Sequence, residues 1–344
     1  MTDTKKKTVL VIGGGSVGAI AALNLEFGGL ATVTVVLRSN FKVVKENGYS
    51  IESCDHGSVK AWRPAFVRNE VPNIAAESLP PYDYIVLTTK NIPDVPPTIS
   101  TLISPALPAN NTHTTLVLIQ NGLNIEKPII QAYPHTPVLS GVSLIGSEET
   151  APGTIVQDDR DRLLIGAFNN PNLDAETATS RAKEFVTIYG KGGKTEVSYS
   201  DNVAHDRWRK LVYNACLNPI CAITGLDTGR IRLADGSVEG LVRPAMREIV
   251  AAAKANGVVL GEGVVDDMIE VDPLDLYLSP SMLADVRKAN FIEFENLLGE
   301  PLREGKKVGV QMPTLEVLYH IARALQWRTK EGRGLVDIPE KRKH

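Results

Sequence analysis

The chain of 344 residues has little of several things that would define a class of protein. It has only three cysteines, Cys54, Cys216 and Cys221, with no Cys-x-x-Cys pair and no histidine at ligand spacing. So sparse and odd a count indicates a reducing compartment, and it supplies neither a disulfide framework nor a structural zinc site. We therefore expect no bound metal.

An excess of charge of one sign is also lacking, as are long hydrophobic runs. The net charge of −3 argues against the basic face that nucleic-acid binding needs. No stretch approaches the ~18 apolar residues of a membrane span, and no N-terminal apolar run is typical of a signal peptide. We expect a cytoplasmic protein whose partner is a small molecule, with neither nucleic acid nor membrane involved. The sequence does not define an oligomeric state, and a homodimer is the default expectation.

The first half of the chain alternates short β-rich runs with helical or loop segments. Continuous apolar runs are typical of strands buried on both faces of a parallel sheet. Between the first two runs, residues 17–27 have helical spacing and end at Gly28-Gly29, which completes a strand–helix–strand unit. The strands predicted in the first 150 residues are 8–12, 32–37, 84–88, 115–119 and 138–143.

The pattern changes from strands to helices near residue 200. Three more strands are predicted at 154–157, 163–166 and 195–197, after which helices are expected at 203–218, at 237–256, in a stretch ending near Leu298, and at 314–326. We therefore predict an α/β chain with a parallel-sheet domain over 1–200, an all-helical domain over 201–330 and a tail over 331–344.

A glycine-rich loop follows the first predicted strand. The run Gly13-Gly14-Gly15-Ser16-Val17-Gly18 matches GxGxxG at its first, third and sixth residues. In this motif the glycines allow a tight turn, a close backbone approach to a pyrophosphate and close helix packing, and the phosphates meet the helix N-terminus. The position between a strand and a helix predicts that this loop binds a dinucleotide in a Rossmann-type domain.

Selection between the two nicotinamide cofactors is predicted at the end of the second strand. NAD enzymes usually carry an acidic residue there, whereas an arginine accommodates the 2′-phosphate of NADP. Arg38 occupies this position, with Ser39, Asn40 and Lys42 close by and no carboxylate near it in the sequence. A guanidinium forms strong charge-assisted bonds to phosphate. The sequence favours NADPH over NADH, although Arg38 could also be an ordinary exposed strand-end residue.

Polar residues follow the third and fourth strands, where open α/β sheets place their ligands. Lys90 follows Thr88-Thr89, and Asn121 stands between Gln120 and Gly122. Lys90 is equally consistent with a solvated lysine, and Asn121-Gly122 is also a common turn dipeptide.

The first predicted helix of the second domain carries a row of polar side chains. Lys210, Asn214 and Asn218 recur every four residues beside an apolar stripe. Asparagine is mildly unfavourable inside a helix, so a purely solvated row would more naturally use other residues. A lysine with two amides could orient a carbonyl and a carboxylate. Pro219 is expected to end or kink this helix just after Asn218.

Further along, Ser281 and Glu293 are candidates for the same site. On one continuous helix they would lie about 18 Å apart, too far to share a small ligand. The chain must therefore bend between them if both bind one substrate. Glu293 also has a structural alternative, because Asn290 with Glu293 loosely fits a helix capping box.

With these motifs the chain resembles the ketopantoate reductases, which reduce ketopantoate to pantoate with NADPH in pantothenate biosynthesis. The resemblance extends from Val9 to about Leu325. Its specific parts are Trp208-Arg209-Lys210-Leu211 with Asn214 and Asn218-Pro219, and Ser281-Met282-Leu283-Ala284-Asp285 with Glu293. It implies a Rossmann domain followed by a helical domain.

The resemblance also implies roles for individual residues. Lys210 corresponds to the catalytic lysine, which would protonate the substrate carbonyl as hydride arrives from the cofactor. Glu293 would bind a substrate hydroxyl or orient Lys210, and Asn214, Asn218 and Ser281 would contact the substrate. Lys90 and Asn121 would line the cleft for the nicotinamide and the substrate.

Two departures from the family pattern concern the substrate. Thr228 stands where bacterial members have an asparagine, and Phe291-Ile292-Glu293-Phe294 is less polar than its counterpart. Alternatives are a reductase of another 2-oxo acid or ketone on the same fold, or an NADPH-binding sensor without catalysis. A sensor has no chemical need for the Lys210 row.

Overall fold

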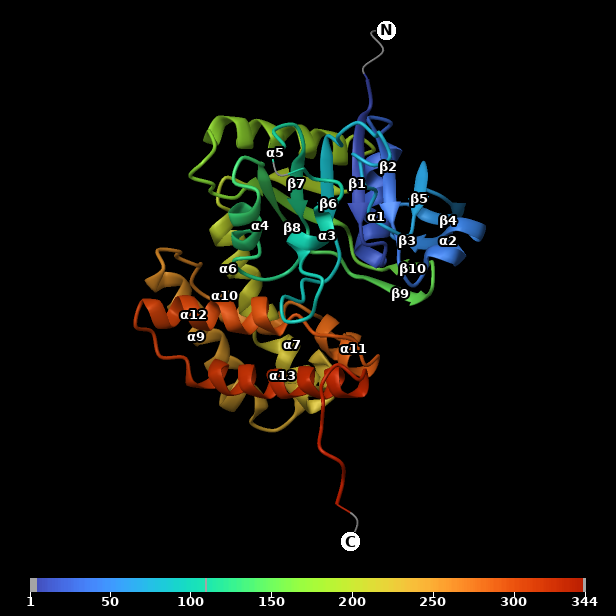
Figure 1. Cartoon of the computed structure of the whole chain (residues 1–344). Coiled ribbons are helices and arrows are strands. Elements are labelled where there is room, and N and C mark those ends of the chain that lie inside the picture. The colour runs from blue at the N-terminus through green and yellow to red at the C-terminus, as the bar shows by residue number, and fades with distance from the viewer. Residues whose placement is uncertain (1–4, 109, 343–344) are drawn as a thin grey trace. The chain divides into compact units, whose positions relative to one another are not determined.

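The structure, a computed structural model, describes residues 5–108 and 110–342. The first four residues of the predicted first domain and the last two of the predicted tail therefore lie outside the described residues. The chain divides into two compact units, which Figure 1 shows in colours running from blue to red. Of the described residues, the sheet unit comprises 5–91, 97–108, 110–120 and 125–203, and the helical unit comprises 92–96, 121–124 and 204–342.

The sheet unit is built on an eight-stranded sheet in the order β12-β11-β8-β7-β6-β1-β2-β5. Neighbouring strands are parallel except for the antiparallel pair β8 and β11. The strands are β1 (Lys7–Ile12), β2 (Ala31–Val36), β5 (Phe66–Arg68), β6 (Tyr84–Leu87), β7 (Thr115–Leu118), β8 (Val138–Ser143), β11 (Arg162–Ala167) and β12 (Glu196–Tyr199). All seven predicted strands that belong to this sheet are confirmed, with ends that differ by at most two residues.

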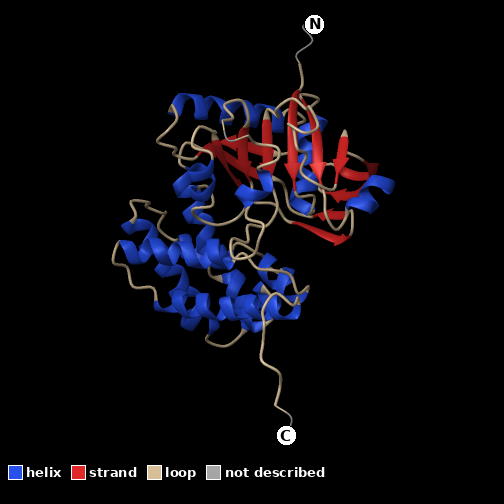
Figure 2. Ribbon diagram, in the orientation of Figure 1, coloured by secondary structure: helices blue, strands red, loops and turns tan. Residues whose placement is uncertain are grey.

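Helices cover both faces of this sheet, as the blue ribbons beside the red strands in Figure 2 show. Val9 and Val11 of β1 pack into one core with α1 and α5, whereas Leu10 and Ile12 pack into a second core with α3 and α4. Because successive side chains of a strand point to opposite faces, a strand covered on both sides must be apolar at every position. The helices are α1 (Ser16–Phe27), α2 (Phe41–Asn47), α3 (Ile99–Ile103), α4 (Lys127–Ala132) and α5 (Ala175–Gly190).

A second, four-stranded sheet in the order β4-β3-β10-β9 belongs to the same unit. Its strands are β3 (Tyr49–Ser53), β4 (Gly57–Trp62), β9 (Ser147–Ala151) and β10 (Thr154–Gln157). The sequence predicted only β10, because the other strands carry many polar residues and show no continuous apolar run. Strands β9 and β10 pack on α1, so this sheet lies close to the glycine loop.

The helical unit surrounds a single core that includes Trp208, Met246 and Leu298. The short loops 92–96 and 121–124, which lie between strands of the sheet unit in the sequence, are part of it. The Leu123 N–H donates to the Asn296 carbonyl, and Asn296 Nδ2 donates to the Leu123 carbonyl. Its helices are α6 (Val203–Asn214), α7 (Leu217–Thr224), α8 (Thr228–Leu233), a π-helical turn (Val238–Val242), α9 (Arg243–Ala255), α10 (Val264–Glu270), a 3₁₀ turn (Leu274–Leu276), α11 (Ser281–Arg287), a second π-helical turn (Glu295–Gly299), α12 (Glu300–Lys307) and α13 (Pro313–Gly332).

The single helix predicted over 203–218 is wrong. Helix α6 ends at Asn214 and α7 begins at Leu217, so the break precedes Pro219 instead of following Asn218. A proline ring clashes with the carbonyl four residues earlier, which here belongs to Ala215. Pro219 is instead accommodated in the first turn of α7, where a missing N–H costs little. The predicted row is therefore divided between two helices, with Asn218 on the second.

Candidate functional site

The glycine loop joins β1 to α1 and is shaped to receive a group against its backbone. A side-chain carbon on Gly18 would lie 2.0 Å from the Gly13 carbonyl oxygen and 2.6 Å from Thr88 Oγ1, so only glycine fits there. On Gly15 the same carbon would meet nothing nearer than a Glu149 carboxylate oxygen at 4.0 Å. Gly15 is thus the exposed, open side of the loop, as approach to a pyrophosphate requires.

The N-terminus of α1 is available to a ligand. Gly15 is its N-cap residue and supplies no side chain to the first N–H groups, which have no partners within the helix. The Gly14 carbonyl is held from the protein side, because Asn40 Nδ2 and Tyr49 Oη donate to it at 2.7 and 2.9 Å. Ser16 Oγ donates to the Ser147 carbonyl at 3.1 Å. In such loops the N–H groups at the start of the helix are the ones that bind phosphate.

The remaining residues predicted for the cofactor lie around this loop or at neighbouring strand ends. Val17 is half-buried and packs on the core of the sheet unit. Arg38 is exposed after β2, and its guanidinium has no partner among the described residues. Lys90 is exposed after β6, where Gln120 Nε2 donates to the neighbouring Thr89 carbonyl at 2.7 Å. The sheet unit thus presents an exposed arginine at the end of β2, the strand next to the one that leads into the glycine loop.

The second group of predicted residues comes together in the helical unit. Lys210 Nζ of α6 donates to Asn121 Oδ1 at 2.8 Å, and Asn121 Nδ2 donates to Glu293 Oε2 at 3.2 Å. Glu293 is only 8% exposed, in the segment just before the second π-helical turn. An ammonium, an amide and a carboxylate therefore form one hydrogen-bonded chain.

The environment of Lys210 makes it a better acid than an ordinary lysine. Burial, followed by the nearby Arg207 guanidinium, lowers the pKa of Lys210 to about 8, while Glu293 acts in the opposite direction. Arg207 is itself buried on α6, one turn earlier, and donates to the Gly122 carbonyl at 2.9 Å. An ammonium with such a pKa is protonated at neutral pH and gives up its proton readily.

Gly122 explains how Asn121 is held in place. Its φ of +102° is rarely adopted by other residues, and an added side-chain carbon would lie 2.5 Å from Asn296 Cβ. The turn dipeptide Asn121-Gly122 is therefore real, and it also directs the Asn121 amide to Lys210 and Glu293. The structural and functional interpretations of Asn121 are compatible.

The other predicted substrate contacts form a smaller group. Asn218 Nδ2 of α7 donates to Ser281 Oγ at 3.3 Å, and Ser281 is exposed at the start of α11. Asn214 is 9% exposed at the end of α6, and its amide bonds to no other described residue. Lys210, Asn121 and Glu293 are thus linked to one another, and Asn218 is linked to Ser281.

The predicted bend between Ser281 and Glu293 is confirmed. Helix α11 ends at Arg287, and the next helical residue is Phe294. The capping-box alternative for Glu293 is wrong, because the first helical residue after Asn290 is Phe294, so Asn290 is not an N-cap residue. Its side-chain oxygen instead accepts from Arg333 Nη2 at 3.4 Å. Glu293 directs its carboxylate to Asn121 instead.

Thr228 is 1% exposed at the start of α8, and its hydroxyl has no hydrogen-bond partner in the described chain. An unpaired buried hydroxyl is destabilising. We expect Thr228→Val to raise the free energy of unfolding by about 1 kcal/mol, measured by chemical denaturation. In the control Thr224→Val the lost hydroxyl is exposed and donates to the Ile220 carbonyl at 2.8 Å, so no gain is expected. A large loss of stability in Thr228→Val would instead reveal a partner for this hydroxyl.

Two residues in these sites were missed by the sequence analysis. Arg207 could have been found, since it lies three residues before Lys210 and therefore on the same side of a helix. Glu149 of β9, whose carboxylate lies beside the glycine loop, gave no local signal. It reaches the loop only because the second sheet packs on α1.

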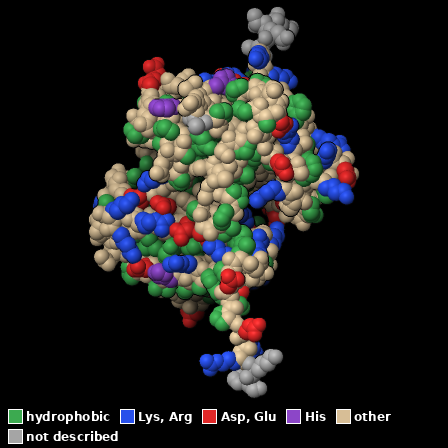
Figure 3. Space-filling view, viewed as in Figure 1, with side chains coloured by type: hydrophobic (Ala, Val, Ile, Leu, Met, Phe, Trp, Pro, Cys, Tyr) green, Lys and Arg blue, Asp and Glu red, His purple; other side chains and the backbone are tan. Residues whose placement is uncertain are grey.

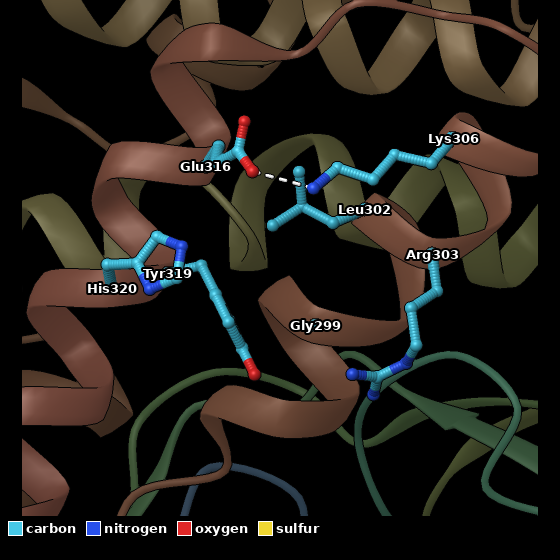
Figure 4. A pocket seen from close by; sticks show the side chains of 7 residues that line it. All are labelled: Gly299, Leu302, Arg303, Lys306, Glu316, Tyr319 and His320. Carbon is cyan, nitrogen blue, oxygen red and sulfur yellow. Dashed lines mark hydrogen bonds and ion pairs between the residues drawn. The ribbon is translucent and has the colours of Figure 1, made fainter.

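A separate pocket of the helical unit is lined by residues of the second π-helical turn, α12 and α13 (Figure 4). Its cations already have partners, since Lys306 pairs with Glu316 at 2.6 Å and Arg303 pairs with Glu295 and Glu300 at 2.9 and 2.7 Å. None of the residues predicted for catalysis lines it. We therefore assign it no part in the reaction.

On the face shown in Figure 3, the basic and acidic side chains are interspersed instead of gathering in one basic patch. None of the helices in the described ranges is long and apolar enough to cross a membrane. Within the same ranges, no three His, Cys, Asp or Glu side chains are grouped as metal ligands would be.

The fold and these sites define a class: an oxidoreductase with a dinucleotide-binding domain and a helical domain that carries a lysine. Comparison with known proteins gives the family. Residues 9–170 match the family described as ketopantoate reductase PanE/ApbA, and residues 202–326 match its C-terminal domain. The chain belongs to the ketopantoate reductase family, and it is a nicotinamide-dependent oxidoreductase with the family's fold.

Individual proteins show how far the similarity extends. An uncharacterized protein of Saccharomyces cerevisiae is 38% identical, over 97% of both chains. The crystal structure of 2-dehydropantoate 2-reductase from Methylococcus capsulatus matches with a TM-score of 0.78 and 32% sequence identity, over 94% of this chain and 97% of that one. A D-mandelate dehydrogenase structure shares the fold, with a TM-score of 0.78 at 19% identity over 94% of this chain and 99% of that one.

Proposed function

We propose that this protein reduces a 2-oxo acid with NADPH, and that its principal substrate is ketopantoate, the precursor of pantoate in pantothenate biosynthesis. The observation that carries the proposal is the hydrogen-bonded chain from Lys210 through Asn121 to Glu293. A lysine with a pKa of about 8, held by an amide, is suited to protonate a carbonyl oxygen. A cofactor sensor would have no use for it.

The glycine loop fits the cofactor. Gly15 offers the open backbone against which a pyrophosphate can lie, and the N-terminus of α1 offers N–H groups. Arg38 at the end of β2 would bind the 2′-phosphate through charge-assisted hydrogen bonds. We assign Gly13, Gly14, Gly15, Ser16, Val17 and Gly18 to this loop, and Lys90 to the nicotinamide side. When bound, the cofactor supplies the hydride that reduces the carbonyl carbon.

Lys210 performs the acid step in this mechanism. Its ammonium donates a hydrogen bond to the carbonyl oxygen of the substrate, stabilises the negative charge that develops there, and transfers its proton to that oxygen. Asn121 accepts from the same Nζ and so fixes the direction of the remaining N–H bonds. Glu293 holds the Asn121 amide and keeps the lysine charged by its own negative charge.

The pair formed by Asn218 and Ser281 would bind the polar groups of the substrate. Ser281 is exposed and Asn218 donates to it, so the serine hydroxyl can in turn donate to a carboxylate or accept from a hydroxyl. Asn214 lies one helical turn after Lys210, and its side-chain amide forms no hydrogen bond with another described residue. We propose that it contacts the substrate beside the reacting carbonyl.

The experiment that tests this function follows the absorbance of NADPH at 340 nm with a panel of 2-oxo acids. We expect oxidation of NADPH with ketopantoate at the highest kcat/KM, and lower values with branched 2-oxo acids that lack its hydroxyl. Faster turnover of another member would reassign the substrate within the same chemistry. If the protein binds NADPH and reduces none of the panel, the proposal of a 2-oxo acid reductase is wrong.

A further inference from the structure

A carboxylate that is distant in the sequence lies beside the cofactor loop. Glu149 belongs to β9 of the four-stranded sheet, and it follows the end of β2 by more than a hundred residues. The packing of β9 on α1 places its side chain next to Gly15 and Asn40. Gly15 is predicted to contact the pyrophosphate, and Asn40 follows Arg38, which is predicted to select the cofactor.

One oxygen of Glu149 is fixed by the protein. Its Oε1 accepts from Asn40 Nδ2 at 2.9 Å and from the Gly153 N–H, also at 2.9 Å. The same Asn40 amide donates to the Gly14 carbonyl at 2.7 Å, so strand β9, the end of β2 and the glycine loop share one hydrogen-bonded connection. The carboxylate therefore has a defined position.

The other oxygen is available to a ligand. Glu149 Oε2 lies 4.0 Å from the position of an added carbon on Gly15, on the open side of the loop, and no described residue donates to it. Glu149 is half-buried, so its charge is only partly screened by water. Any dinucleotide seated on the loop would approach this oxygen.

An acid near the end of β2 has a recognised chemical consequence. In dinucleotide-binding folds, a carboxylate there accepts from the ribose 2′-hydroxyl and opposes a 2′-phosphate. The local sequence after β2 has no acid, but the fold brings Glu149 to Asn40 at that strand end. Arg38, two residues earlier, favours the phosphate, so the adenosine end of the site combines a cation with an anion.

We propose that Glu149 determines cofactor specificity together with Arg38, and that it accepts from a ribose hydroxyl and limits the preference for NADPH over NADH. This inference rests on the proposed cofactor function. The protein therefore binds NADPH in preference to NADH by a smaller factor than it would if Arg38 acted without Glu149.

The test is the substitution Glu149→Gln, with dissociation constants for NADPH and NADH measured by calorimetry on the whole chain. Glutamine keeps an oxygen for Asn40 and Gly153 and removes only the charge. The ratio of the NADH to the NADPH dissociation constant is expected to rise by roughly 5- to 20-fold, because a charged acceptor for NADH is lost and a repulsion on NADPH is relieved. A thermal unfolding midpoint equal to that of the wild-type protein would show that the variant is folded.

Glu148→Gln is the matched control. It makes the same change in net charge one residue earlier on β9, where an exposed side chain points to the other face of the strand. Its nucleotide ratio should equal that of the wild type. An unchanged or lower ratio in Glu149→Gln, or an equal rise in Glu148→Gln, overturns the inference. If the wild-type protein binds neither nucleotide, the proposed function itself fails, and the inference fails with it.

Discussion

Lys210→Ala is expected to lower kcat for ketopantoate by roughly 10²–10⁴, the usual contribution of a positioned acid. The dissociation constant for NADPH should change little, because the proposed contact of Lys210 is with the substrate carbonyl, whereas the glycine loop and Arg38 hold the phosphates of the cofactor. Stopped-flow kinetics together with nucleotide titration would separate these two effects. The control is Arg209→Ala, which removes a neighbouring exposed cation and should keep turnover. Near-normal turnover in Lys210→Ala would instead make this lysine structural.

The same residue predicts the pH profile. Lys210 acts as an acid only in its ammonium form, so kcat/KM should be constant below its pKa of about 8 and fall as the pH rises above it. Glu293 raises this pKa, so Glu293→Gln should move the midpoint of the decline to lower pH. A midpoint that stays in place in Glu293→Gln would show that the two groups are not coupled.

Arg38→Ala is expected to raise the dissociation constant for NADPH by roughly 10- to 150-fold, the loss of a charge-assisted contact to phosphate. The constant for NADH should change by much less, since that nucleotide has no 2′-phosphate. The exposed guanidinium has no partner within the described chain, so its removal should leave the thermal midpoint unchanged. Arg38→Lys should give an intermediate effect, because an ammonium keeps the charge but lacks the two-pronged geometry.

Equal use of the two nucleotides by the wild-type protein would contradict the role of Arg38 only if Glu149→Gln also left them equal. If Glu149→Gln restores a preference for NADPH, both residues act as proposed. The two substitutions therefore form a cycle in which the arginine and the carboxylate are measured against each other.

The sequence predicted the main sheet of the fold well. Strands β1, β6 and β8 were recognised because both faces of each are covered, which requires apolar residues at every position. The glycine loop was recognised because its spacing is local. The predicted helix over 203–218 is broken near Ala215. Pro219 ends a helix before itself, near the carbonyl four residues earlier, whereas the prediction placed the end of the helix just after Asn218.

The sequence by itself determined which segments form buried strands, where the glycine loop lies, and that Lys210 and Glu293 are candidate site residues. Only the tertiary structure decided which of them meet. Asn121 joins Lys210 and Glu293 across 89 and 172 residues of chain, and Asn40 meets Glu149 across 109. Periodicity and composition report how an element is buried, but they carry no information on which distant element packs against it. Strand β9, which carries Glu149, has no apolar run in its sequence, so its place beside the loop follows from packing alone.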